Sequence, residues 1–308
     1  MIIDIHYHYI RLSANEESAH RVMSDLLEDA QRTGFNKPTE GFIPVLRDMI
    51  DDPECDKLVK RMGENGIDMT AICYVDNYDN GSANERIMNS NELCARAAAK
   101  HPEKLISMAG IDPRRPDAPA LLRRCLTEFK MKGLKWHPDD GYYPNSKEAY
   151  AMLGVLNEFG YPLLTHCSPL PKSRAKFALP IHLDDVAKDF PNLEIIAAHM
   201  GNLWWHDWLA LAQYKKNISG DLAMWQITAT AKPTLFRRYL REILDNIGPH
   251  QIIWSTDGPI FEPLVSNREF ISIMKGLTVK DADGIVFTQA EVDAMLGGNA
   301  ARIFKLKK

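Results

Sequence analysis

The sequence lacks the features that mark secreted or membrane proteins. Only five of its 308 residues are cysteine, they are scattered, and none forms a CxxC pair. An odd, scattered set of cysteines argues against a disulfide framework and favours a reducing compartment. No apolar run approaches the roughly 20 residues that cross a bilayer, and the N-terminus carries Asp4, His6 and His8 where a signal peptide needs apolar residues. We therefore expect a cytoplasmic protein without a membrane partner.

The sequence also lacks a dominant charge, a repeat and a linker. Its net charge is −4, and no long run of Lys or Arg offers a nucleic acid an electrostatic footprint. The composition is 45% hydrophobic and 25% charged, which is ordinary for a globular protein with a sizeable core. With no low-complexity segment or composition shift to divide it, the chain is expected to form one domain over residues 1–308.

Short apolar runs alternate with longer amphipathic stretches along the chain. The expected strands are 2–8, 67–75, 104–111, 132–137, 161–166, 193–199, 217–222 and 250–256. The expected helices lie near 53–65, 83–100, 117–129, 146–159, 180–189, 203–215, 231–246 and 266–276. Gly66, Gly133, Gly160 and Gly248 stand where helices should give way to strands.

Eight strands alternating with helices predict a distorted (β/α)8 TIM barrel. The runner-up is an open doubly wound sheet, which the absence of a GxGxxG motif after a strand disfavours. Residues 10–52 fit neither pattern. They read as an insertion after the first strand, helical around 15–31, that would lie over the mouth of the barrel.

The opening stretch MIIDIHYHYI places three polar residues at alternate positions. Alternation is the strand period, so Asp4, His6 and His8 are expected on one face of the strand. The opposite face would then carry Ile3, Ile5, Tyr7 and Tyr9. A polar face of this kind is directed either at water or at something that binds imidazole.

The other expected strands end in residues of the same chemical kind. They are Lys135 and His137 on the fourth strand, His166 on the fifth, His199 on the sixth and Asp257 on the eighth. The carboxyl ends of barrel strands share one mouth, so these side chains should converge with the first strand's histidines. Imidazoles with a carboxylate suit zinc and also manganese or iron. Asp257 could then move a proton at a metal-activated water, with His199 as a ligand or polarising group.

In their order along the chain, these motifs resemble those of the amidohydrolase superfamily. The resemblance runs through DIHYH, GLKWHP, the TH at 165–166, FPNLEIIAAHMGN, STDGP and GGNAARIF. The branch in question includes decarboxylases of aminocarboxymuconate semialdehyde and hydroxybenzoates, besides lactone and amide hydrolases. Some lactone hydrolases of this kind keep the fold without a metal.

Carried over by position, the resemblance implies one divalent metal ion held by His6, His8, His166 and Asp257. Zinc is the expected ion and manganese the alternative. His199 would lie beside the metal-bound water as a catalytic residue with Asp257. Members with two metals carry a carboxylated lysine at the end of the fourth strand, so Lys135 is a candidate bridge. We favour one metal and a structural or substrate-contacting Lys135.

A second set of residues is expected to contact a small-molecule substrate. It comprises Lys135, His137, Trp204, Trp205 and Arg174. His137 precedes a proline at a strand end, so it either contacts substrate or caps a loop. The tryptophans either wall the pocket or pack a helix, and the guanidinium of Arg174 fits a carboxylate. A homodimer is the default assembly.

Two reactions fit the same ligand set. The first is hydrolysis of a lactone, amide or ester by a metal-activated water, with Asp257 accepting the proton and His199 steadying the oxyanion. The second is non-oxidative decarboxylation of a small aromatic or muconate-type acid, with Asp257 protonating the carbon that loses CO₂. The GLKWHP segment favours the hydrolase by resemblance. A non-catalytic barrel is disfavoured, because an open metal site beside a carboxylate is what water activation needs.

Overall fold

The computed structural model describes residues 1–10, 41–78, 81–170 and 173–306, with Ser24, Leu27, Glu28, Gln31 and Arg32 between the first two ranges. Eight parallel strands form one sheet in chain order. They are β1 (Ile3–His8), β2 (Met69–Cys73), β3 (Leu105–Gly110), β4 (Leu134–Trp136), β5 (Leu163–Thr165), β6 (Ile195–Ala197), β7 (Ile218–Asp221) and β8 (Ile252–Ile253). A parallel bridge between Tyr7 and Gly258 joins the segment that follows the last strand to the first strand. The predicted TIM barrel is confirmed.

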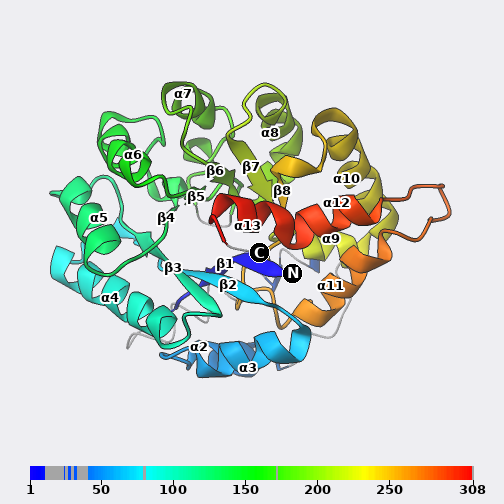
Figure 1. Cartoon of the computed structure of the whole chain (residues 1–308), viewed down its shortest axis with the longest axis horizontal. Helices are drawn as coiled ribbons and strands as arrows, with labels where there is room; N and C mark the ends of the chain where they lie inside the picture. The colour runs from blue at the N-terminus through cyan, green and yellow to red at the C-terminus, as the bar shows by residue number, and fades with distance from the viewer. Residues whose placement is uncertain are drawn as a thin grey trace.

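Helices surround this barrel, as Figure 1 shows. They are α2 (Phe42–Ile50), α3 (Asp56–Asn65), α4 (Asn84–Lys100), α5 (Ala118–Thr127), α6 (Lys147–Phe159), α7 (His182–Asp189), α8 (Trp205–Ala212), α9 (Trp225–Ala231), α10 (Pro233–Ile247), α11 (Asn267–Gly276), α12 (Gln289–Asp293) and α13 (Asn299–Ile303). Their apolar faces pack on outward side chains of the strands and form the larger hydrophobic cluster of the protein. Every strand and helix expected from the repeat of short and long segments is present.

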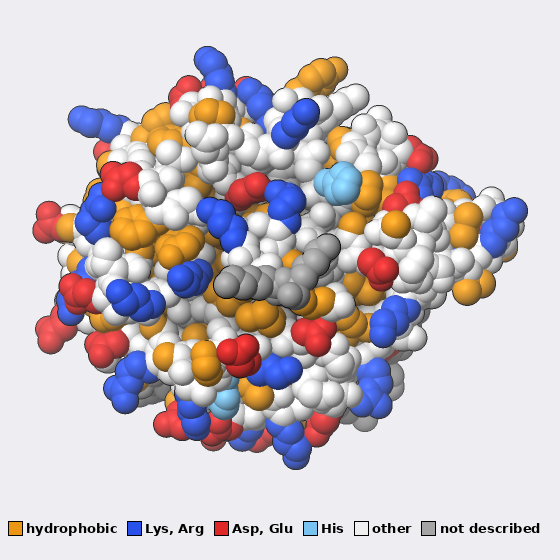
Figure 2. Space-filling model, viewed as in Figure 1, with side chains coloured by type: hydrophobic (Ala, Val, Ile, Leu, Met, Phe, Trp, Pro, Cys, Tyr) orange, Lys and Arg blue, Asp and Glu red, His pale blue; other side chains and the backbone are white. Residues whose placement is uncertain are grey.

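A second, smaller cluster fills the barrel itself. It contains Ile3, Ile5, Ala71, Cys73, Ile106, Met108, Leu164, Ile196, Ala198, Ile253, Ala300 and Ile303. The last two belong to α13, which crosses the amino-terminal end of the barrel in Figure 1. This end is therefore closed by packing, and the chemistry must lie at the opposite, carboxyl end. Figure 2 shows the closed face, where positive and negative side chains are interspersed with no patch of one sign.

The first strand corrects the expected alternation. The pairing of β1 with β2 shifts register between Asp4 and Tyr7, as at a β-bulge. Ile3 and Ile5 consequently belong to the cluster inside the barrel, whereas Tyr7 belongs to the outer one. The expectation that Asp4 shares a face with His6 and His8 was therefore wrong, because the extra residue reverses the faces. Asp4 instead accepts hydrogen bonds from Thr256 N and Oγ1 at 3.1 and 2.5 Å, beside β8.

Much of the expected insertion lies outside the described residues. Of its expected helix around 15–31, the structure describes Ser24, Leu27, Glu28 and Gln31, and these four are helical. The later part of the insertion, α2, buries Phe42, Leu46 and Ile50. Ile50 lines a small cavity together with His8 and other residues, so this end of the segment approaches the carboxyl end of β1. Among the described helices, none is both long and apolar enough to cross a bilayer.

Candidate active site

Five imidazoles form a closed circuit at the carboxyl end of the barrel. Successive ring centroids are 5.0 Å apart from His6 to His8, 6.0 Å to His137, 4.8 Å to His166, 4.9 Å to His199 and 5.4 Å back to His6. All but His137 are buried, and the His137 side chain is 16% exposed. The structure thus brings together histidines from the ends of four strands, as the sequence predicts.

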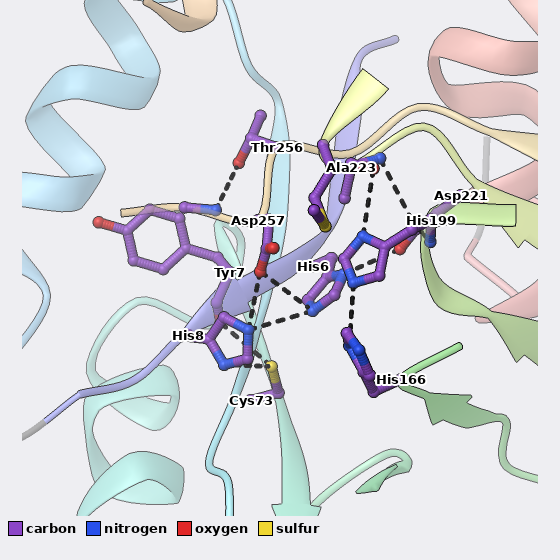
Figure 3. Close-up of polar contacts among 12 residues, drawn as sticks. His6, Tyr7, His8, Cys73, His166, His199, Asp221, Ala223, Thr256 and Asp257 are labelled. Carbon is purple, nitrogen blue, oxygen red and sulfur yellow. Dashed lines mark hydrogen bonds and ion pairs between the residues drawn. The ribbon is translucent and has the colours of Figure 1, made fainter. Parts of the chain in front are cut away.

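Three donor atoms converge at the first strand, where Figure 3 shows His6, His8 and Asp257 facing one another. Nε2 of His6 and Nε2 of His8 are 3.2 Å apart, and Asp257 Oδ1 lies 3.4 Å from the former and 2.8 Å from the latter. Ligands of one metal ion at about 2.1 Å lie roughly 3.0–3.4 Å from one another. Asp257 Oδ1 is buried and no described group gives it a hydrogen bond of good geometry. These atoms fit the donor set of a divalent cation.

The outer nitrogens of these rings explain which atoms can bind metal. His6 Nδ1 lies 2.9 Å from Asp221 Oδ2, and His199 Nδ1 lies 3.1 Å from the carbonyl oxygen of Ala223. His166 Nε2 lies 2.9 Å from the carbonyl oxygen of Ser168. Each oxygen requires a proton on the nitrogen that faces it, so the neutral rings carry their lone pairs on the inner nitrogens.

This proton placement creates a second donor pair. His166 Nδ1 and His199 Nε2 face each other at 3.1 Å, both without a proton in the neutral rings. Two lone pairs at that distance repel unless a cation lies between or beside them. His166 therefore pairs with His199, and no described contact joins its ring nitrogens to His6, His8 or Asp257. Three members of the expected ligand set thus contact one another and the fourth, His166, contacts His199; the full four-residue set stays a prediction.

Lys135 lies against the first group. Its Nζ is 2.8 Å from His6 Nε2, and the residue is 1% exposed. Since His6 Nδ1 donates to Asp221, Lys135 donates to the Nε2 lone pair that a metal ion would take. Burial lowers the pKa of Lys135. Its expected contact with substrate stays a prediction.

Burial and neighbouring charges set the protonation of the site. Burial holds the pKa of His6 and of His199 well below the ordinary value, which keeps both rings neutral and able to bind metal. For Asp257, burial raises the pKa, but the facing imidazoles of His6 and His8 outweigh it and hold it well below 3.8. For His8, burial is outweighed by Cys73 and Asp257, which raise its pKa to about 9.

Two residues of the site were missed at the sequence level. Asp221 ends β7 and is fully buried, and its Oδ1 accepts the backbone N–H groups of His199 at 2.6 Å and Ala223 at 3.2 Å. Cys73 ends β2, with Sγ 3.9 Å from His8 Nδ1. Both stand at carboxyl ends of expected strands, the same signal that identified the histidines.

The expected substrate contacts have different surroundings. His137 stacks on His166 with ring planes 12° apart, at the edge of the imidazole circuit. Trp205 is buried and packs on Tyr239 of α10 with ring centroids 5.1 Å apart, which is the contact of a helix-packing tryptophan. Trp204 is half-buried. Arg174 is exposed, and its backbone N–H donates to Asp139 O at 3.0 Å. Substrate roles for these residues stay predictions.

The backbone is unusual at two of these positions. His199 has φ 66° and Asp257 has φ 54°, in the left-handed region that residues with a side chain rarely adopt. Such conformations persist only where surrounding contacts determine them, and they concentrate at functional sites. For His199, the bond from its N–H to Asp221 supplies one such contact.

Comparison with known proteins agrees with this geometry. A family model described as amidohydrolase matches residues 3–306. No curated protein matches the chain. A solved structure of an uncharacterised TIM-barrel protein from Bordetella bronchiseptica is 15% identical, with a TM-score of 0.72, and the match covers 99% of this chain and 98% of that one.

Two further solved structures are decarboxylases. The 5-carboxyvanillate decarboxylase of Novosphingobium aromaticivorans, complexed with manganese and 4-hydroxy-3-methoxy-5-nitrobenzoic acid, is 15% identical with a TM-score of 0.69. That match covers 99% of this chain and 96% of that one. A dihydroxybenzoic acid decarboxylase of a Polaromonas species, with manganese and 2-nitroresorcinol, is 17% identical with a TM-score of 0.67 and coverage of 100% and 97%. At these identities the likeness establishes the fold.

Proposed function

The chain belongs to the amidohydrolase family, and from this premise we propose that it is a metal-dependent decarboxylase of a small aromatic or muconate-type carboxylic acid. The observation that carries the proposal is the convergence of His6, His8 and Asp257 on one donor site. Support also comes from the decarboxylases that share the fold over the whole chain and contain manganese. These comparisons favour decarboxylation over the hydrolysis that the GLKWHP segment suggested.

The proposed metal site is the first donor group, with His166 and His199 beside it. When bound, a divalent ion would hold the acid's carboxylate and an adjacent hydroxyl and stabilise the negative charge that develops there. Manganese is suggested as the ion by the similar decarboxylases, which contain it. Zinc is suggested by the imidazole-rich donor set. Asp221 would keep His6 Nδ1 protonated, so that Nε2 faces the ion.

The remaining steps are assigned to side chains of the chain itself. Asp257 would carry a proton, taken up from solvent or the substrate hydroxyl, to the carbon that bears the carboxylate. The carbon–carbon bond to the carboxylate breaks and CO₂ leaves. The electron pair of the broken bond stays on the ring or enol carbon and forms the new carbon–hydrogen bond with the proton. One proton is consumed for each CO₂ released. His137, at the exposed edge of the imidazole circuit, would contact the ring of the substrate.

Hydrolysis of a lactone, amide or ester is the second candidate. The buried Asp257 Oδ1, without a good hydrogen bond beside two imidazoles, is also placed to accept a proton from an attacking water. His199 Nε2 would then stabilise the developing oxyanion. This reaction uses the same residues as decarboxylation and differs from it in its products.

Product chemistry separates the two reactions. Purified protein loaded with manganese or zinc would be assayed on hydroxybenzoates, carboxymuconates, pyrones and lactones, measuring CO₂ and protons in parallel. We expect CO₂ from an aromatic or muconate-type acid, with the rate falling at least about 100-fold in Asp257→Asn. Proton release without CO₂ from a lactone or ester would overturn the proposal in favour of the hydrolase.

A further inference from the structure

One cysteine differs from the other four in what surrounds it. Cys55, Cys94, Cys125 and Cys167 are buried in the outer hydrophobic cluster between barrel and helices. Cys73 belongs instead to the cluster inside the barrel and is fully buried there. It ends β2 and stands opposite His8 of β1 in the parallel register, so the two side chains leave the sheet on the same side.

The sulfur lies next to one of the proposed metal-binding rings. Its Sγ is 3.9 Å from His8 Nδ1, the other nitrogen of the ring whose Nε2 faces Asp257, and Figure 3 shows it beside that ring. The thiol also donates a hydrogen bond to the carbonyl oxygen of Tyr7 at 3.4 Å. One donor atom from each of His6, His8 and Cys73 lies within 4.8 Å of the other two. Nitrogen and sulfur ligands of one zinc ion lie roughly 3.6 Å apart, so coordination requires the thiol to leave Tyr7 O and turn toward the Nε2 atoms of His6 and His8. The unsatisfied Asp257 Oδ1 points independently to a cation at the same place.

We propose that Cys73 is a metal ligand, and that with His6, His8 and Asp257 it makes the centre prefer a thiophilic divalent ion such as zinc or cobalt. The inference rests on the proposed metal centre. Coordination replaces the thiol hydrogen by the metal, and the released proton passes to solvent. A sulfur donor favours zinc and cobalt over manganese, the ion held by the similar decarboxylases.

Cobalt is the direct probe of a sulfur ligand. The full-length protein would be freed of metal with a chelator, loaded with Co²⁺ and examined by absorption spectroscopy. We expect a sulfur-to-cobalt charge-transfer band in the near ultraviolet, together with the visible d–d bands. The band should be absent from Cys73→Ser with the d–d bands retained. It should persist in Cys167→Ser, which removes a buried thiol that follows His166 but packs in the outer cluster.

Affinity provides the second readout. Cys73→Ser should weaken zinc binding at least about tenfold and leave manganese binding within about twofold. If Cys73→Ser does not fold, X-ray absorption of the zinc-loaded parent still tests the proposal through a zinc–sulfur distance of about 2.3 Å. Bound cobalt with d–d bands but no charge-transfer band, or a zinc shell of nitrogen and oxygen alone, would overturn the role of Cys73 and leave the centre intact. Failure to bind any cobalt or zinc would overturn the metal centre itself.

Discussion

Oδ2 of Asp221 lies 2.9 Å from Nδ1 of His6, while Oδ1 of the same carboxylate accepts the backbone N–H of His199 at 2.6 Å. One buried side chain at the end of β7 thus sets the proton position on the proposed ligand His6 and supports the backbone conformation at His199. The two donor groups are coupled through it. Asp221 is a positioning residue, because its carboxylate oxygens bond to His6 Nδ1 and to backbone N–H groups, and not to His6 Nε2.

Asp221→Asn should weaken metal binding without unfolding the barrel. The amide no longer places a negative charge beside His6 Nδ1, so the ring loses basicity and its preferred tautomer. Metal affinity should fall about 10- to 100-fold, measured by competition with a chromophoric chelator. Thermal unfolding monitors the fold, and Asp185→Asn on exposed α7 surface is the control that should leave affinity unchanged. An Asp221→Asn protein with parental affinity would contradict the positioning role.

The number of bound ions depends on whether both groups of donor atoms, the one at His6 and the one at His166, hold an ion. With one ion at the first group, elemental analysis of protein purified without added metal should give about one equivalent, lost in His6→Ala. His166→Ala should then lower activity but retain most of the metal. Near two equivalents in the parent, with one lost in each variant, would mean that His166 and His199 hold a second ion. Lys135, 2.8 Å from His6 Nε2, would then become the candidate bridge.

Much of the fold was accessible from sequence because each βα unit carries its own pattern. A short apolar run followed by an amphipathic helix recurs eight times, with a glycine or proline before most of the strands, and closure at eight strands follows from barrel geometry. The β1 bulge was not accessible in this way. The alternating sequence from Ile2 to His8 gives no sign of whether the strand contains a bulge. Only the pairing with β2 shows the bulge and therefore the face on which Asp4 lies.

The site was predicted as a set of strand-end residues, and its internal pairing was not. The sequence places His166 at the carboxyl end of β5 but does not show that Ser168 turns its Nε2 outward and leaves Nδ1 facing His199. Asp221 escaped notice because one aspartate at a strand end is common. Its contacts come from residues 215 positions earlier and 22 positions earlier in the chain, and no local pattern reports them.

The free energy of unfolding of the metal-free protein should depend on pH through His137. Burial lowers the pKa of His137 to about 3, whereas the unfolded ring keeps a pKa near 6.5. Between these values the unfolded ring binds one more proton than the folded one. His137 by itself therefore makes stability rise with pH by up to about 1.4 kcal/mol per unit, and this contribution is lost on acidification from pH 6.5 toward 3. Urea unfolding at several pH values should show a shallower slope in His137→Gln. His206→Gln, at an exposed position, should keep the parental slope.

Gly258→Ala should damage both stability and the metal site, because Gly258, in the segment after β8, pairs with Tyr7 of β1. A Cβ there would stand 2.4 Å from Cδ2 of Tyr7, far inside contact distance. The carbonyl of Gly258 accepts the backbone N–H of His8 at 2.5 Å, so a shift of this backbone moves a metal ligand and the adjoining Asp257. We expect a loss of about 1–3 kcal/mol in unfolding free energy with weaker metal binding.

Gly154→Ala, in α6 with no atom within 4 Å of the added Cβ, should instead be neutral or stabilise by up to about 1 kcal/mol. If Gly258→Ala and Gly154→Ala had the same unfolding free energy and the same metal affinity, the pairing of Gly258 with β1 would not hold His8 in position.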